Sequence, residues 1–142
     1  MTTSSDLYQQ AILDLAKSAD GAGRLEAPDG AAQGDSPLCG DRVRMEVKLK
    51  DGRIVALAHE VKGCLLCRAA AAAIGRHAAG LDAAQVAALR AEVAALLACQ
   101  VSAAPSWPEL KCFEPVRPHR NRHGCVLLPL DTLAAALDGA LR

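Results

Sequence analysis

The strictest pattern in this chain is the alternation of apolar and charged residues over positions 42–50. Every second side chain is apolar and those between are charged, as in a strand with one buried face. Asp51-Gly52 follows directly and accepts the positive φ angles of a two-residue hairpin turn, and residues 54–61 supply a returning strand. The sequence therefore predicts an antiparallel β-hairpin.

After the hairpin, the spacing of apolar residues becomes that of helices. Residues 64–78 are rich in alanine, and a second helix is predicted to start near Asp82, where Gln85 completes a capping box. The spacing of apolar residues and the positions of turn-forming residues also predict the secondary structure of most of the remaining chain. We predict helices over residues 5–18 and 131–141, a loop or short irregular edge strand over residues 19–36, and loops over residues 102–108 and 117–123.

The length and composition fit one folded domain over residues 1–142. The chain is 51% hydrophobic and too short for two ordinary domains. Its 16 basic residues balance its 16 acidic residues, so no net charge attracts nucleic acid or an anionic membrane. Tyr8, Trp107 and Phe113 are its only aromatic residues, which leaves little on which bases could stack. We therefore expect no nucleic-acid partner.

The N-terminal residues lack the basic and apolar regions of a secretory signal, and charges interrupt the alanine-rich segments. We therefore expect a cytoplasmic protein with no membrane span, and its helix faces suit a monomer or a weak homo-oligomer.

In a reducing cytoplasm its 6 cysteines should be thiols. We interpret two of them, Cys99 and Cys112, as small hydrophobic residues packed in the core.

Three cysteines stand at predicted junctions between elements, where functional sites often form. Cys39 precedes the first strand of the hairpin, Cys64 follows the second, and Cys125 precedes the last helix. Because a hairpin returns the chain on itself, Cys39 and Cys64 can be neighbours. The helix N-terminus at Cys64 favours its thiolate form, and to a smaller degree that of Cys67, which suits metal binding or nucleophilic chemistry.

Asp41 places a carboxylate two residues after Cys39. Gly40 between them lets the backbone bend so that thiolate and carboxylate can face one ion. A single carboxylate among thiolates makes a metal site more exchangeable than thiolates alone. The same residues also fit a turn capped by aspartate, and the pattern alone leaves both interpretations open.

Three cysteine-containing segments together resemble a known family. Ser36-Pro37-Leu38-Cys39-Gly40-Asp41 is similar to a segment Asn-Pro-x-Cys-Gly-Asp, and Gly63-Cys64 follows at the matching distance. Arg122-His123-Gly124-Cys125-Val126-Leu127-Leu128 is similar to a segment Arg-x-Lys-Cys-Ala-x-Leu. These segments are typical of the iron-sulfur cluster assembly scaffolds that include SufU, IscU and NifU.

Two further features resemble the SufU branch of this family. Leu110, Phe113 and Val116 match its Leu-x-x-Phe-x-x-Val stretch. The predicted helix over residues 82–97 corresponds to the insertion that distinguishes SufU-like from IscU-like chains. The resemblance therefore covers about residues 5–141 and is closer to the SufU branch.

The resemblance implies a single-domain α+β fold, with a small three-stranded antiparallel sheet packed against helices, as in SufE-like and NifU-like proteins. It implies that Cys39, Asp41, Cys64 and Cys125 bind iron, a transient cluster expected to be [2Fe-2S], or zinc. Cys39 or Cys125 would accept persulfide sulfur from a cysteine desulfurase, and apo iron-sulfur proteins would receive the cluster. The chain would then be a scaffold and sulfur acceptor rather than a free-standing enzyme.

The chain also departs from the family pattern. Gly124 stands where IscU-like chains have the histidine before the last cysteine, which argues against a histidine ligand of that kind. His123, one place earlier, is either an accessory ligand or a solvated loop residue. The chaperone motif Leu-Pro-Pro-Val-Lys is missing, which argues against dependence on an Hsp70-type chaperone. Cys67 is an additional thiol that can relay sulfur or pack in the core. Arg120 and Arg122, in a basic loop, are candidates for docking the desulfurase or are solvated.

Two other functions fit part of the pattern. Cys64-Leu65-Leu66-Cys67 has the Cys-x-x-Cys spacing of thiol redox proteins, although those folds use crossover units where this chain has a hairpin. A zinc-binding sulfurtransferase partner of the desulfurase would use the same four ligands as the scaffold. The sequence does not separate iron from zinc, because both accept thiolate.

Overall fold

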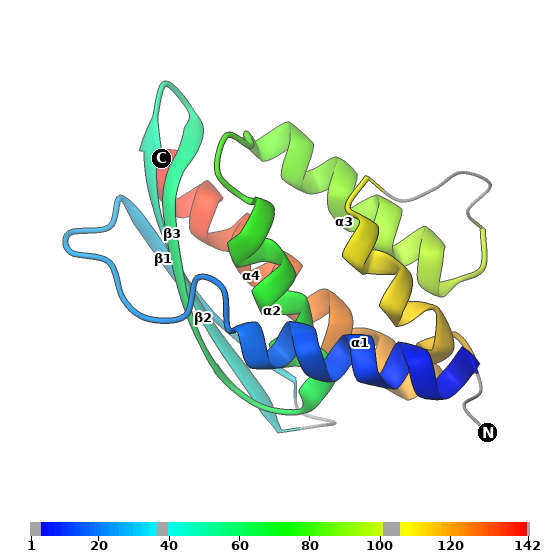
Figure 1. The fold of residues 1–142 in the computed structure, drawn as a ribbon. Helices are drawn as coiled ribbons and strands as arrows, with labels where there is room; N and C mark the ends of the chain where they lie inside the picture. The colour runs from blue at the N-terminus through cyan, green and yellow to red at the C-terminus, as the bar shows by residue number, and fades with distance from the viewer. Residues whose placement is uncertain (1–3, 37–39, 101–105, 142) are drawn as a thin grey trace.

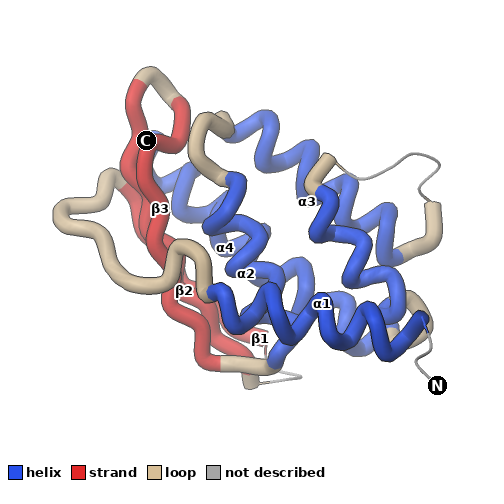
Figure 2. The backbone as a smooth tube through the Cα atoms, viewed as in Figure 1, coloured by secondary structure: helices blue, strands red, loops and turns tan. Residues whose placement is uncertain are grey.

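A computed structural model describes residues 4–36, 40–100 and 106–141, with side chains from Gln10 onward. It contains a three-stranded antiparallel sheet in the order β1-β2-β3, with the helices packed on one side of it (Figures 1 and 2). The predicted α+β fold class is thereby confirmed. The elements are α1 (Ser4–Ser18), β1 (Gly30–Ser36), β2 (Asp41–Lys50), β3 (Arg53–Lys62), α2 (Leu65–His77), α3 (Ala83–Leu97), the 3-10 helix η1 (Pro108–Val116) and α4 (Arg120–Leu141).

The predicted hairpin is formed by β2 and β3. Asp51 and Gly52 both have positive φ, 53° and 76°, as a tight hairpin turn between twisted strands requires. Val43 pairs with Val61 across the two strands, and the side chains of Val43, Met45 and Val47 are fully buried. The alternation in the sequence therefore corresponds to one face covered by helices and one face carrying charges.

Residues 19–36 were predicted to form a loop or a short irregular edge strand. The last part of this range forms the edge strand β1. It pairs antiparallel with β2, from Gly30 opposite Val47 to Ser36 opposite Asp41. Its two glycines let α4 approach the sheet closely. A Cβ atom on Gly30 would lie 2.3 Å from the Ala136 carbonyl oxygen, and one on Gly34 would lie 2.4 Å from Thr132 Oγ1.

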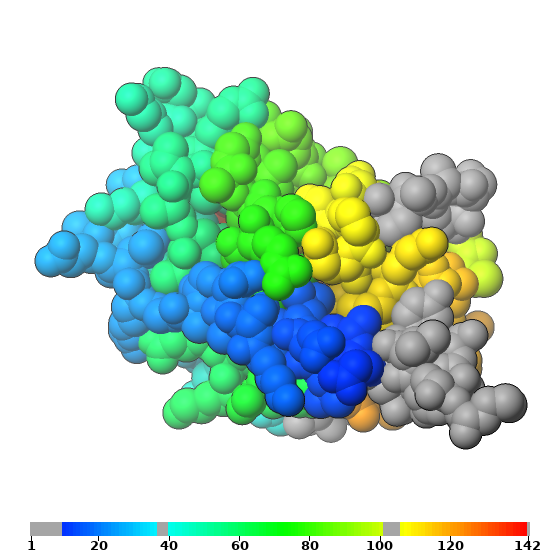
Figure 3. All heavy atoms as spheres, in the orientation of Figure 1, coloured from blue at the N-terminus to red at the C-terminus, as the bar shows by residue number. Residues whose placement is uncertain are grey.

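The helices form a layer whose apolar side chains make one core with the inner face of the sheet. α4 contacts β1 and β2, while α2 contacts β3, α1 and α4. The space-filling view shows α1, in blue, lying against α2 and η1 (Figure 3). The predicted capping box of α3 is present, because Asp82 accepts the Gln85 N–H and the Gln85 side chain accepts the Asp82 N–H.

The sequence prediction is wrong at the start of the last helix. α4 begins at Arg120, so the predicted basic loop over residues 117–123 ends in the first turn of a helix that is much longer than residues 131–141. Pro129 is inside α4, although proline usually breaks a helix. It lacks the N–H that would donate a hydrogen bond to the Cys125 carbonyl oxygen. The core contacts of the flanking helical turns hold the helix together there. The 3-10 helix η1 begins at Pro108, the last residue of the predicted loop over residues 102–108, and the described residues 106 and 107 of that loop are not helical.

α4 has the length and apolar composition of a membrane-spanning helix, a property shared by core helices of folded domains. Here it is the helix that covers the sheet, and its buried residues include Leu133 and Leu137. Its apolar character is therefore accounted for by the core.

The close approach of α4 to β1 gives a testable prediction. Gly30→Val should lower the free energy of unfolding by roughly 1–3 kcal/mol, because the new side chain meets the α4 backbone. Gly139→Ala is the control, since nothing lies within 4 Å of its Cβ position, and it should leave stability unchanged or raise it by up to about 1 kcal/mol. Urea unfolding of both variants measures this, and equal stability would contradict the packing described.

Candidate metal centre

Three of the four predicted ligands come together from distant parts of the chain. Asp41 is the first residue of β2, Cys64 is the N-cap of α2, and Cys125 lies in the second turn of α4. One carboxylate oxygen and the two sulfur atoms all lie within 4.8 Å of one another. Thiolates with one carboxylate are a donor set that both zinc and iron accept.

Asp41 is tied to the beginning of α2 by two hydrogen bonds. Its Oδ1 accepts the Cys64 backbone N–H at 2.9 Å, and its Oδ2 accepts the Cys64 thiol at 3.3 Å. The residue is only 2% exposed. A buried carboxylate needs such donors, so these bonds fix its orientation toward Cys64.

Gly63 provides the space for this arrangement. A Cβ atom at Gly63 would lie 2.6 Å from Asp41 Oδ1 and 2.8 Å from its carboxyl carbon, which is closer than real Cβ contacts. In the sequence, Gly63 is recognisable only as part of the Gly63-Cys64 segment. Its role follows from β2–β3 pairing, because Arg42 pairs with Lys62 and the next residues on each strand, Asp41 and Gly63, therefore meet.

Arg122 lies in the centre itself, whereas the sequence predicted a loop residue that docks the desulfurase or is solvated. The sulfur atoms of Cys64 and Cys125 accept hydrogen bonds from its guanidinium and raise the pKa of Arg122. Its Nε is buried with no hydrogen-bond partner among the described residues. Arg122 and Cys125 are three residues apart on α4 and so share one helix face, a signal that depends on recognising the helix.

The other predicted site residues lie elsewhere or outside the described part of the chain. Cys39 is outside the described residues. The Cys67 side chain is fully buried in the hydrophobic core. His123 Nε2 lies 3.0 Å from the Arg117 carbonyl oxygen and 3.2 Å from that of Val116, a position that holds α4 to the end of η1. Arg120 is exposed to solvent.

Cys99 and Cys112, both predicted to be packed in the core, have opposite environments. Cys112 is buried as predicted, and desolvation together with the charge of Glu109 raises the pKa of its thiol to about 12. Cys99 is exposed, so the prediction is wrong for that residue. It follows the end of α3 with φ of 62°, a left-handed conformation that turns the chain away from the helix.

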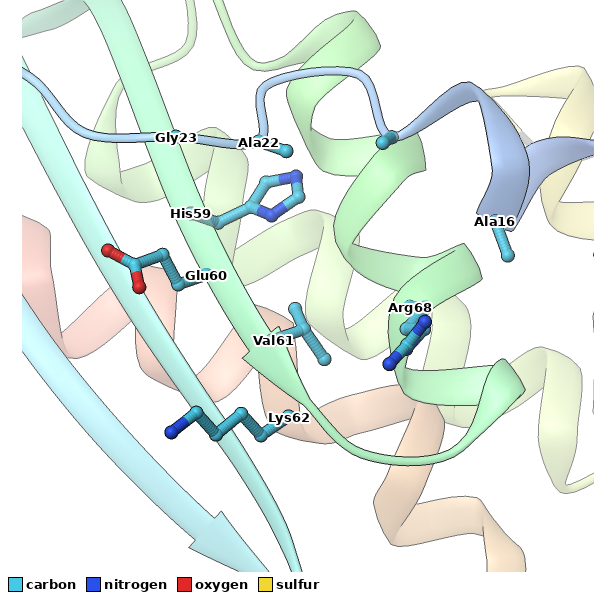
Figure 4. A pocket seen from close by; sticks show the side chains of 9 residues that line it. Ala16, Ala22, Gly23, His59, Glu60, Val61, Lys62 and Arg68 are labelled. Carbon is cyan, nitrogen blue, oxygen red and sulfur yellow. The ribbon is translucent and has the colours of Figure 1, made fainter.

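A separate cavity of about 350 Å³ lies between β3, α2 and the loop after α1 (Figure 4). The buried His59 lines it, and its Nε2 donates to the Asp20 carbonyl oxygen at 2.7 Å. Burial lowers the pKa of His59, so the imidazole is neutral at pH 7. The backbone of the same loop also forms hydrogen bonds with the backbone of His59. This histidine therefore has a structural role and connects the loop to the sheet.

Comparison with known proteins places the chain in a family. Residues 7–106 match the family model of the NifU-like N terminal domain. The chain belongs to this family, and the resemblance inferred from the cysteine segments is confirmed. Cys125 lies beyond the matched residues, and the fold brings it to Asp41 and Cys64.

Solved structures and a curated relative agree with this placement. The crystal structure of a nitrogen-fixing NifU-like protein (N-terminal) from Brucella abortus is 33% identical, covers 96% of each chain and has a TM-score of 0.88. A putative iron-sulfur cluster assembly scaffold protein for the SUF system from Fervidobacterium islandicum AW-1 is 22% identical, covers 95% of this chain and 99% of its own, has a TM-score of 0.84, and supports the fold. The iron-sulfur cluster assembly scaffold protein IscU of Thermotoga maritima is 32% identical over 65 residues, which is 46% of this chain and 46% of that protein.

The cysteine environments predict an order of alkylation. At pH 8.5, iodoacetamide should modify Cys112 at least about a hundredfold more slowly than the exposed Cys99, because burial keeps Cys112 protonated and inaccessible. Peptide mapping by mass spectrometry over time measures both rates. Modification of Cys112 at the rate of Cys99 in the folded protein would contradict the described core.

Proposed function

We propose that this protein is an iron-sulfur cluster assembly scaffold, with iron and sulfur as its substrates. The observation that carries the proposal is the convergence of Asp41, Cys64 and Cys125 in a NifU-like fold. Cys39, two residues before Asp41 in the chain, is the proposed fourth ligand. The names of the Thermotoga and Fervidobacterium relatives support the same role.

The donor set suits a site that must release its cargo. Thiolates bind iron strongly, and a single carboxylate is a weaker partner that exchanges more readily. The positive charge of Arg122 offsets part of the negative charge that two thiolates and one carboxylate bring together. The site is therefore proposed to hold a [2Fe-2S] cluster transiently and to pass it to apo-proteins.

Sulfur enters by transfer between thiols. The thiolate of Cys39 or Cys125 attacks the outer sulfur of a persulfide on a cysteine desulfurase. A new S–S bond forms on the scaffold, the donor's S–S bond breaks, and the donor cysteine leaves as a thiolate. Two Fe²⁺ ions, two sulfane sulfur atoms and two electrons from an external one-electron reductant then give [2Fe-2S]²⁺. We propose that the chain meets the desulfurase and the acceptor proteins in the cytoplasm.

A second candidate is a zinc-dependent sulfur acceptor that uses the same residues. The observation that favours it is the pairing of a buried carboxylate with thiolates, which suits tetrahedral zinc. The thiol redox alternative has less support, because Cys67 is fully buried and a resolving thiol must reach its partner. Arg120 and Arg122 were both predicted to dock the desulfurase. We keep only the exposed Arg120 for this role, because Arg122 interacts with the thiols of Cys64 and Cys125.

Anaerobic reconstitution separates the first two candidates. The protein is incubated with ferrous iron, cysteine and a desulfurase, and iron, acid-labile sulfide and zinc per chain are measured. A scaffold should take up iron and sulfide together, and Cys64→Ser or Cys125→Ser should lose at least about tenfold in both. Tight zinc without sulfide uptake would replace the scaffold proposal with the zinc-dependent sulfur acceptor.

The space at Gly63 gives a sharper test of the ligand geometry. Gly63→Ala should weaken Co²⁺ or Fe²⁺ binding about tenfold or more, because the methyl group displaces the Asp41 carboxylate. Gly124→Ala is a matched control beside Cys125, with no atom within 4 Å of its Cβ position, and should bind like the wild type. Equal affinities for the two variants, measured by Co²⁺ absorption titration, would remove Asp41 from the proposed ligand set.

A further inference from the structure

The cavity between β3, α2 and the loop after α1 has a buried hydrogen-bond acceptor in its wall. His59 lines this cavity of about 350 Å³ and is only 4% exposed. Its Nδ1 has no hydrogen-bond partner among the described residues. Buried polar atoms in folded proteins are almost always hydrogen-bonded, so this exception requires an explanation. A ligand in the cavity that donates a hydrogen bond to Nδ1 provides one.

The orientation of the ring shows which group such a ligand must offer. Nε2 lies 2.7 Å from the Asp20 carbonyl oxygen, which only accepts, so the neutral ring carries its proton on Nε2 and a lone pair on Nδ1. The Cδ2 atom faces the loop, where a Cβ atom on Gly21 would lie 3.3 Å from it. Nδ1 is on the opposite edge of the ring and points away from the loop, toward Val61 (Figure 4). The wall therefore accepts a hydrogen bond from a donor in the cavity.

Arg68 provides a positive charge at the same cavity. Its side chain lines the cavity from α2, is exposed, and forms no ion pair with any described residue. The other charged residues in the wall, Glu60 and Lys62, direct their side chains away from the His59 ring (Figure 4), and Glu60 pairs with Arg24. The guanidinium of Arg68 is therefore available to a carboxylate, which it can bind through two parallel hydrogen bonds.

The rest of the wall is small and apolar. Ala16, Ala19 and Ala22, from the end of α1 and the loop after it, line the cavity together with Val61 of β3. The volume is near the lower limit of the roughly 300–1,000 Å³ that small-molecule sites occupy. A short carbon chain with one carboxylate and one hydroxyl group matches these walls. An amino group in place of the hydroxyl would be positively charged, and no carboxylate is directed into the cavity to balance it.

We propose that this cavity binds a small hydroxycarboxylic acid. The carboxylate pairs with the guanidinium of Arg68, the hydroxyl group donates to Nδ1 of His59, and the carbon chain packs against the alanines. The hydroxyl group decides the specificity, because an acid without it leaves Nδ1 unpaired. None of the lining residues is a candidate metal ligand, so this site is separate from the metal centre and does not depend on the scaffold function.

Nuclear magnetic resonance titration of the isotope-labelled full chain tests the proposal with acids of one carbon skeleton. The 2-, 3- and 4-hydroxybutyrates place the hydroxyl group at different distances from the carboxylate, and butyrate lacks it. At least one hydroxybutyrate should bind at least about tenfold more tightly than butyrate. The amide shifts should be concentrated at residues 22–23 and 59–62. Absence of binding, equal affinity for all these acids, or shifts centred elsewhere overturns the proposal.

Two variants test the two polar contacts separately. Arg68→Gln should weaken binding of the preferred hydroxybutyrate about tenfold or more. Lys50→Gln is the control, because it removes the same charge from an exposed position at the hairpin end of β2, and it should bind like the wild type. His59→Gln keeps an amide donor for the Asp20 carbonyl oxygen and removes Nδ1, so it should abolish the preference for hydroxybutyrate over butyrate. If His59→Gln does not fold, the exposed Arg68 decides, and wild-type affinity in Arg68→Gln overturns the proposal.

Discussion

The buried carboxylate of Asp41 is the constraint on which the candidate centre depends. A charge that is almost fully removed from water requires donors, and it finds them in the backbone N–H and the thiol of Cys64. The pairing of β2 with β3 places the two residues opposite each other, and Gly63 leaves room for the carboxylate. The hairpin thus serves the site as well as the core, because its register sets the distance between two candidate ligands.

The position of Cys125, the third candidate ligand, depends on how closely α4 packs on the sheet. Cys125 and Arg122 share one face of α4, and the glycines of β1 allow that helix to lie against the strands. A bulkier edge strand would push α4 outward and carry both residues away from Cys64. Core packing and site geometry are therefore coupled, and a change at Gly30 or Gly34, whose neighbours are residues of α4, should alter the geometry of the centre.

The parts of the structure predicted from sequence are those with strong local signals. The hairpin followed from strict alternation and Asp51-Gly52, and α3 followed from the pairing of Asp82 with Gln85. The start of α4 could not be predicted in this way, because Gly124 and Pro129 indicate a break and only tertiary contacts override them. Cys99 was assigned to the core from residue type alone, and its exposure depends on where α3 ends.

The same difference between local and tertiary signals applies to the site. The cysteine segments identified Asp41, Cys64 and Cys125 as candidates without any structure, since their order and spacing are specific. Arg122 was found only as a basic residue, because its position against the thiols requires both the helix and its packing. The cavity at His59 is formed by three segments that are distant in sequence, and no pattern along the chain indicates it.

X-ray absorption spectroscopy of the metal-loaded full chain tests the central claim most directly. With iron or zinc bound, the account predicts three sulfur ligands at about 2.3 Å and one oxygen ligand at about 2.0 Å, the latter lost or replaced in Asp41→Ala. A metal coordinated only by nitrogen and oxygen, or by sulfur atoms with a spectrum that Asp41→Ala leaves unchanged, would contradict a centre built from Asp41 and the cysteines.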